Sequence, residues 1–176
     1  MRTLATLALT AALLAACGQQ SASDMAIEES KAEAQADQKT LAEGKAWLAQ
    51  NAGVAGMVTL PSGVQYRVVK EGPEGGRHPT IDDEVTIHYE GRLIDGTVFD
   101  SSIERGEPAS FPLRAVIPGW AEAVTKMTPG DVFEVFIPPE QAYGPTPKGP
   151  IPGNSVLIFR IELFDITGPA APSALG

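Results

Sequence analysis

The sequence predicts an α+β fold in which a mainly antiparallel sheet packs on one short helix and is preceded by a helical spacer. Short runs of alternating apolar and polar residues recur after Pro61, and such runs are typical of strands. The 18 glycines and 15 prolines favour turns and strands over a helix bundle. Residues 25–50 contain no proline and are rich in Ala, Glu, Lys and Gln, which are good helix formers. These patterns separate one helical segment from one sheet domain.

Composition and charge exclude several classes of function. A chain of 176 residues has room for one domain with extensions. The net charge of −9 disfavours non-specific nucleic-acid binding, because an acidic chain releases no counterions from phosphate. The sequence has one cysteine, Cys17, and two histidines, His78 and His88, so it lacks the ligands of a cysteine-rich metal site. We therefore expect no metal, no cofactor and no nucleic-acid partner.

The N-terminus is typical of an export signal. The apolar run from Leu4 to Ala16 is too short to span a bilayer and fits the apolar part of a secretory signal over residues 1–16. The order Leu14-Ala15-Ala16-Cys17 resembles the bacterial lipobox, which implies lipid attachment to Cys17 and an anchored protein. In Gram-negative lipoproteins, which this order resembles, an Asp after the cysteine is a retention signal for the inner membrane. The resemblance therefore implies that Gly18 directs the protein to the outer membrane, facing the periplasm of the bacterial cell envelope. The alternative is an ordinary signal peptide with a chance cysteine.

Residues 17–24 are predicted to form a lipidated, flexible tether, because most of them are small and polar. Residues 25–60 form the predicted helical spacer, with Asp24 as its cap and its helix ending between Asn51 and Gly56. Two alternatives stay open for this helix. It is either a mostly solvated spacer or a docking or dimerising helix anchored by Trp47.

Residues 61–168 are predicted to form the compact domain, and residues 169–176 a disordered tail. The Asp95-Gly96 pair is typical of a hairpin turn. Trp120 and Val124 lie four residues apart, so they share one face of a helix that begins at Pro118. Alternating apolar residues and turn signals place the strands of the domain at 64–69, 85–90, 98–101, 132–137 and 157–163.

Three segments of this domain resemble the FKBP family of peptidyl-prolyl cis-trans isomerases. They are VTIHYEGRLIDGTVFDSS at 85–102, VIPGWAEAV at 116–124 and the stretch from AYG to IPGNSVLIFRIEL at 142–163. The segment Ser62-Gly63-Val64-Gln65-Tyr66 resembles the Ser-Gly-x-Gln-Tyr strand that precedes the domain in bacterial macrophage-infectivity-potentiator-like lipoproteins. The resemblance implies a five- or six-stranded antiparallel sheet curled around a short helix.

The same resemblance implies a set of site residues around a pocket that takes the substrate proline. Asp100 matches the pocket carboxylate of the family, and Arg105 matches its ion-pair partner. Ala109 stands where the family has an aromatic residue. The residues implied as catalytic are Asp100, Tyr143, Trp120, Phe99 and Tyr89, and those implied as substrate-binding are Val116, Ile117, Phe159, Phe111, Arg105 and Ile151.

The implied activity is rotation about X–Pro bonds. That rotation breaks amide resonance at a cost of about 18–20 kcal/mol, and it needs no nucleophile, metal or cofactor. An aromatic pocket that binds the twisted amide better than the planar forms would suffice. The expected substrates are proline-containing exported polypeptides, the expected anchor is the lipid on Cys17, and macrolides are candidate ligands.

Several alternatives stay open. Asp100 either shapes the pocket by bonding Tyr89 and Arg105, or acts directly on the twisted amide. The whole domain could serve as a binding module or chaperone that uses the same pocket without turnover. Dimerisation is undecided, because the N-terminal part is shorter than the long dimerising helix of the subgroup.

Overall fold

The computed structural model describes residues 22–169. The predicted signal peptide, Cys17 and residues 170–176 of the predicted tail lie outside the described residues. Contacts divide the chain into residues 1–33 and 34–176, and the division falls within helix α1 (Ala22–Asn51). In the first unit, residues 24–32 are all exposed. None of the described helices is long and apolar enough to cross a membrane.

Helix α1 begins earlier than predicted. Its first residue is Ala22, so Asp24 lies inside the first turn instead of at the cap. A carboxylate is favourable there, because it faces the positive end of the helix dipole. The helix ends at Asn51, where the sequence predicted its end.

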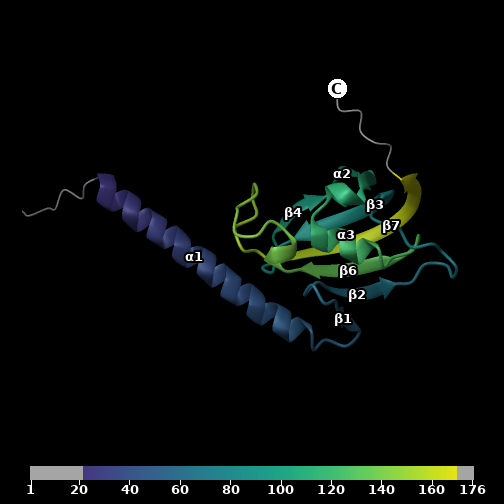
Figure 1. Cartoon of the computed structure of the whole chain (residues 1–176), viewed down its shortest axis with the longest axis horizontal. Coiled ribbons are helices and arrows are strands. Elements are labelled where there is room, and N and C mark those ends of the chain that lie inside the picture. The colour runs from purple at the N-terminus through teal and green to yellow at the C-terminus, as the bar shows by residue number, and fades with distance from the viewer. Residues whose placement is uncertain (1–21, 170–176) are drawn as a thin grey trace, which may run out of the picture. The chain divides into compact units, whose positions relative to one another are not determined.

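The second unit is built on one antiparallel sheet of seven described strands in the order β1-β2-β6-β7-β3-β4, with β5 pairing with β3 (Figure 1). The strands are β1 (Met57–Thr59), β2 (Gln65–Lys70), β3 (Asp83–Arg92), β4 (Val98–Ser101), β5 (Ala109–Pro112), β6 (Val132–Ile137) and β7 (Leu157–Pro169). The short helices are α2 (Ser102–Arg105), α3 (Pro118–Val124) and the 3₁₀ turns η1 (Leu113–Ala115) and η2 (Pro139–Gln141).

The α+β class and the strands predicted between residues 64 and 163 are confirmed, but two strands were missed. Strand β1 lies in the segment predicted as the end of the spacer, and its three residues are too few to show an alternating pattern. Strand β5 lies in a segment for which no element was predicted. With both strands the described sheet has seven, one more than the upper number that the family resemblance implies.

The core lies between α3 and the sheet (Figure 1). Strand β3 alternates strictly between buried and half-buried residues, with Val85, Ile87 and Tyr89 facing the core. Trp120 and Val124 of α3 are buried against the same strands. The period-2 pattern of the strands and the four-residue spacing of the helix therefore meet in one core.

Residues 34–51 of α1 dock on the domain. The Trp47 ring lies 5.5 Å from the Phe136 ring, between centroids. The Gln65 side-chain amide donates to the Leu48 carbonyl at 2.9 Å. A Cβ on Gly44 would lie 2.8 Å from Val156 Cγ2, so a larger residue here would force the helix or Val156 to shift. This part of the helix therefore contacts the domain through Gly44, Trp47 and Leu48, while most of its other residues are exposed.

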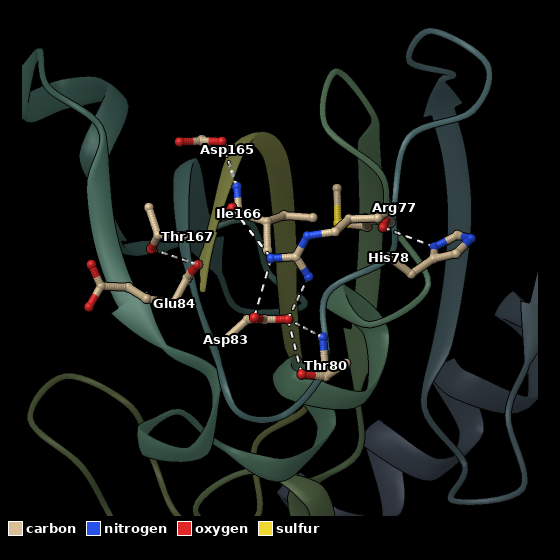
Figure 2. A network of polar contacts seen from close by, with 9 residues as sticks. Arg77, His78, Thr80, Asp83, Glu84, Asp165, Ile166 and Thr167 are labelled. Carbon is tan, nitrogen blue, oxygen red and sulfur yellow. Dashed lines mark hydrogen bonds and ion pairs between the residues drawn. The ribbon is translucent and has the colours of Figure 1, made fainter. Parts of the chain in front are cut away.

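An ion pair closes the loop that leads into β3 (Figure 2). The Arg77 guanidinium donates to Asp83 Oδ2 at 2.8 Å, and the Thr80 backbone N–H donates to the same oxygen at 2.7 Å. Arg77 also reaches the Ile166 carbonyl of β7 at 3.5 Å. The hydrogen bond from Arg77, followed by that from Thr80, holds the pKa of Asp83 well below its usual range.

Candidate active site

A pocket of about 390 Å³, here called the aromatic pocket, opens between α3 and the sheet. Its lining comes from strands β3, β4, β5 and β7, from α3 and the residues just before it, and from the loop after η2. The lining residues are Tyr89, Phe99, Asp100, Phe111, Ala115, Val116, Ile117, Trp120, Tyr143, Pro150, Ile151 and Phe159.

Trp120 is positioned by the start of α3. Pro118 occupies the first turn of the helix, where its missing N–H costs nothing, and Ile117 is the residue before it. The Trp120 backbone N–H donates to the Ile117 carbonyl at 3.1 Å. The indole is 4% exposed, so it is part of the core as well as of the pocket wall.

The aromatic rings around Trp120 meet edge to face. Phe111 lies 6.2 Å from Trp120 at an interplanar angle of 77°, and Tyr89 lies 5.8 Å from Phe111 at 66°. Phe99 and Phe159 form a further edge-to-face pair at 5.6 Å. A Cβ on Gly91 would lie 2.5 Å from Phe99 and 2.8 Å from Phe159, so a glycine in β3 makes room for both rings. Edge-to-face contacts are a favourable arrangement of aromatic rings, and here they join the rings that line the pocket.

A polar cluster lies at the edge of the pocket. The Tyr89 hydroxyl donates to Asp100 Oδ2 at 2.5 Å, and Arg105 Nη1 donates to Asp100 Oδ1 at 2.5 Å. Arg105 Nη2 donates to the Tyr89 oxygen at 2.9 Å, and its guanidinium carbon lies 5.6 Å from the centre of the tyrosine ring. The three side chains thus bond one another in a closed triangle.

This triangle fixes the protonation states of its members. Burial acts to raise the pKa of Asp100, but hydrogen bonds from Tyr89 and Arg105, with the arginine charge, outweigh it and lower that pKa. Burial, with the hydrogen bond to Asp100, raises the pKa of Tyr89. At neutral pH Asp100 is therefore a carboxylate that accepts hydrogen bonds, and Tyr89 keeps its proton.

Ser102 holds the backbone of Tyr89, a role that the sequence did not predict. Its fully buried hydroxyl accepts from the Tyr89 N–H at 2.8 Å and lies 3.2 Å from the Tyr89 carbonyl. His88 Nδ1 lies 3.0 Å from the same hydroxyl. Ser101 has a different task, since its hydroxyl accepts from the Glu104 N–H and caps α2. The sequence did offer a signal for Ser102, because it is the last residue of the segment 85–102 that resembles the family.

The loop after η2 positions Tyr143, Pro150 and Ile151. The Asn154 N–H donates to the Gly144 carbonyl at 2.8 Å, which closes the base of the loop. The Tyr143 side chain is 40% exposed, so its hydroxyl can meet a ligand at the mouth of the pocket. This agrees with its expected place in the wall.

The structure brings all the predicted site residues of the domain together. Every one lines the pocket except Arg105, which lies behind Asp100 as its ion-pair partner. Sequence reasoning missed Ala115 and Pro150, which line the pocket without an aromatic or charged side chain to mark them. Among residues 22–169, no group of three or more His, Cys, Asp or Glu residues is arranged to hold a metal ion.

Known proteins share this sequence and fold. The solved structure of FkpA from Escherichia coli superposes with a TM-score of 0.76 at 38% identity, covering 84% of this chain and 70% of that one. Peptidyl-prolyl cis-trans isomerase Mip of Coxiella burnetii is 49% identical over 70% of this chain and 54% of its own length. Outer membrane protein MIP of Legionella longbeachae is 48% identical over 71% of this chain and 53% of its own length.

The chain therefore spans about half the length of these curated relatives. Two family models also match the sequence. The domain described as amino-terminal to FKBP-type peptidyl-prolyl isomerase matches residues 6–68. The FKBP-type peptidyl-prolyl cis-trans isomerase domain matches residues 75–164, a range that includes every residue lining the aromatic pocket, so this chain belongs to the FKBP-type peptidyl-prolyl cis-trans isomerase family, among its Mip and FkpA members.

Proposed function

We propose that this chain catalyses cis–trans isomerisation of X–Pro peptide bonds in polypeptides. The observation that carries the proposal is the aromatic pocket itself, with the buried Trp120 indole in its wall and apolar rings around it. A pocket of about 390 Å³ suits a proline ring and the residue before it better than an extended chain. Membership of the isomerase family supports the same conclusion.

The chemistry asks little of the protein beyond preferential binding. The planar amide has more charge on its oxygen than the twisted amide, so water stabilises the planar form more. Moving the bond from water into an apolar pocket therefore lowers the barrier to rotation. Each tenfold gain in rate requires about 1.4 kcal/mol of preferential binding to the twisted form.

The polar cluster gives the pocket its shape and its charge. Asp100 is held by Tyr89 and Arg105, and its lowered pKa means that it does not donate a proton at neutral pH. It acts either by fixing the pocket wall or through its charge on the twisted amide. The Tyr143 hydroxyl donates to a backbone carbonyl of the substrate and sets its orientation. Macrolides that carry a pipecolyl ring occupy the same pocket and compete with the substrate.

The proposed substrates are exported polypeptides, and the proposed location is the cell envelope. The support is the Leu14–Cys17 sequence, together with a relative named as an outer membrane protein. We propose a lipid on Cys17 that anchors the protein to the outer membrane, facing the periplasm. Mass spectrometry of the N-terminal peptide from membrane fractions tests this point, and an unmodified Cys17 there would refute the anchor.

A rate assay tests the activity. The purified chain is added to a blocked tetrapeptide with a central X–Pro bond, and the relaxation from cis to trans is followed. We expect faster relaxation, and its inhibition by a pipecolyl macrolide. If a folded protein binds the peptide without accelerating its rotation, the pocket is that of a binding module or chaperone.

A further inference from the structure

A second groove, here called the α1 groove, is lined in part by residues that follow directly in sequence on those that line the aromatic pocket. Its volume is about 370 Å³, close to that of the aromatic pocket. Helix α1 supplies Thr40 and Glu43, the turn between β3 and β4 supplies residues 93–95, and the segment before β7 supplies Pro152, Ser155 and Val156. The groove is thus built from three separate parts of the second unit.

Two of these parts, α1 and the segment before β7, are held together by contacts. Gly44 lets α1 approach Val156, and the Asn154 side-chain amide lies 3.4 Å from the Asp37 carbonyl of the helix. The Leu93 N–H donates to the Thr97 carbonyl at 2.9 Å, which closes the β3–β4 turn on the opposite side. A groove between braced elements is formed before any ligand arrives, so binding there needs little reordering.

One stretch of chain connects the groove to the aromatic pocket. Pro150 and Ile151 line the aromatic pocket, and the next residue, Pro152, lines the α1 groove. A polypeptide whose proline occupies the aromatic pocket continues on both sides of that proline. One of its flanks can cross residues 150–152 and enter the α1 groove.

The lining defines the side chains that fit. Leu93, Ile94 and Val156 give an apolar surface, and the carboxylates of Glu43 and Asp95 stand among them. Lys39 lies 3.8 Å from Glu43, but this pair is exposed, and such pairs contribute little. The chain as a whole carries a net charge of −9. An apolar side chain next to a lysine or arginine complements this surface.

We propose that the α1 groove binds the flank of the polypeptide substrate through an apolar residue with a basic neighbour. This inference rests on the proposed isomerase function and adds a second binding site for the same chain of substrate. It makes α1 part of the substrate-binding surface.

The test compares peptides of two lengths. The short substrate is a blocked tetrapeptide with a central X–Pro bond. The long substrates carry six further residues with a Leu-Lys pair, on the amino side in one peptide and on the carboxyl side in another. We expect one long peptide to show about fivefold higher kcat/KM than the tetrapeptide, through a lower KM, the size expected for one apolar and one partly exposed charge contact.

Variants locate that gain. Glu43→Lys and Thr40→Trp should each abolish the gain in kcat/KM of the Leu-Lys peptide and leave the tetrapeptide rate unchanged. Glu43→Lys should show a gain of its own for a peptide with Leu-Glu in place of Leu-Lys. Glu74→Lys makes the same charge change on an exposed loop away from the groove and should alter neither rate. Thr40 is half-buried and Glu43 is exposed, so melting temperatures of both helix variants are measured to check that the fold is intact.

Other outcomes overturn the inference. Equal rates for long and short peptides, or an equal gain in all variants, would show that the groove takes no substrate. If Glu43→Lys changed the molecular mass in sedimentation and left the gain intact, the groove would be a contact between two copies of the chain. Failure of the proposed function gives a different result, in which the protein does not accelerate isomerisation of the tetrapeptide. Fluorescence anisotropy would then still measure whether labelled long peptides bind to the α1 groove.

Discussion

Two ion pairs of the same kind, Arg105–Asp100 and Arg77–Asp83, lie in different surroundings. The Asp83 side chain is 6% exposed and bonds only its own loop, whereas the Asp100 side chain is 43% exposed and lines the aromatic pocket. Both arginines keep their aspartates charged. The Arg105–Asp100 pair therefore belongs to a candidate site because it borders a cavity. The Arg77–Asp83 pair lines neither the aromatic pocket nor the α1 groove and stabilises a loop.

The first prediction tests whether Asp100 serves the site or stabilises the fold. We expect Asp100→Leu to lower kcat/KM for the tetrapeptide about a hundredfold, because the Tyr89 hydroxyl and Arg105 lose their acceptor and the pocket wall loses its charge. The melting temperature should change little, since the pair is partly exposed. Isomerisation rates and a thermal melt measure both effects. A kcat/KM of Asp100→Leu within twofold of the wild-type value would show that Asp100 is not needed for catalysis.

Tyr143 gives a smaller expected loss. Tyr143→Ala should lower kcat/KM about tenfold by removing a wall of the pocket and a donor to the substrate. The side chain is half-exposed, so stability should be unaffected. Tyr143→Phe is the control, because it keeps the ring and removes the hydroxyl. Equal losses in the two variants assign the effect to the hydroxyl, and a loss in Ala alone assigns it to the ring.

Ser102 tests whether the backbone of Tyr89 must be held. Ser102→Ala leaves the Tyr89 N–H without its partner, so we expect stability to fall by about 1–3 kcal/mol and kcat/KM to fall about threefold. Ser101→Ala is matched in chemistry, but it removes only the α2 cap. It should cost about 1 kcal/mol and leave KM unchanged. Recovery of the rate in Ser102→Thr supports positioning by the hydroxyl; identical kinetics in the two alanine variants would argue against it.

Asp83 should affect stability and leave activity unchanged. Its pKa is lowered in the folded chain, so its contribution is fully present above the ordinary carboxyl pKa of about 3.9 and is lost as the pH falls below it. Asp83→Asn should lower the melting temperature by about 5 °C at pH 7, with a difference that narrows in acid. Melts between neutral and acid pH check this. A constant difference at every pH would show that the charge of Asp83 is not what stabilises the loop.

The sequence predicted the parts of the molecule that carry strong local patterns. Alternation of apolar and polar residues along 85–90 and 132–137 predicted two of the strands, β3 and β6. The Pro118–Trp120 segment predicted α3, which contributes Trp120 to the pocket. The sequence did not predict β1, which is too short to show an alternating pattern. It left the docking of α1 open, because that contact depends on the approach of Gly44 to Val156 from a distant segment.

The residues of the candidate site also fall into those that the sequence predicted and those that it missed. Its aromatic and charged residues were predicted because the family motifs contain them. Ala115, Pro150 and Ser102 were missed, since small or ordinary residues acquire their role only from what lies around them in the fold.

The account depends on an apolar pocket that speeds X–Pro rotation without transferring a proton, and the pH dependence of kcat/KM for the blocked tetrapeptide tests this most directly. With the pKa of Asp100 lowered and that of Tyr89 raised, neither group titrates near neutrality. We predict a clear acceleration that stays constant between about pH 5 and pH 9. Absence of acceleration, or a rate that rises and falls steeply around a midpoint in that range, would contradict it.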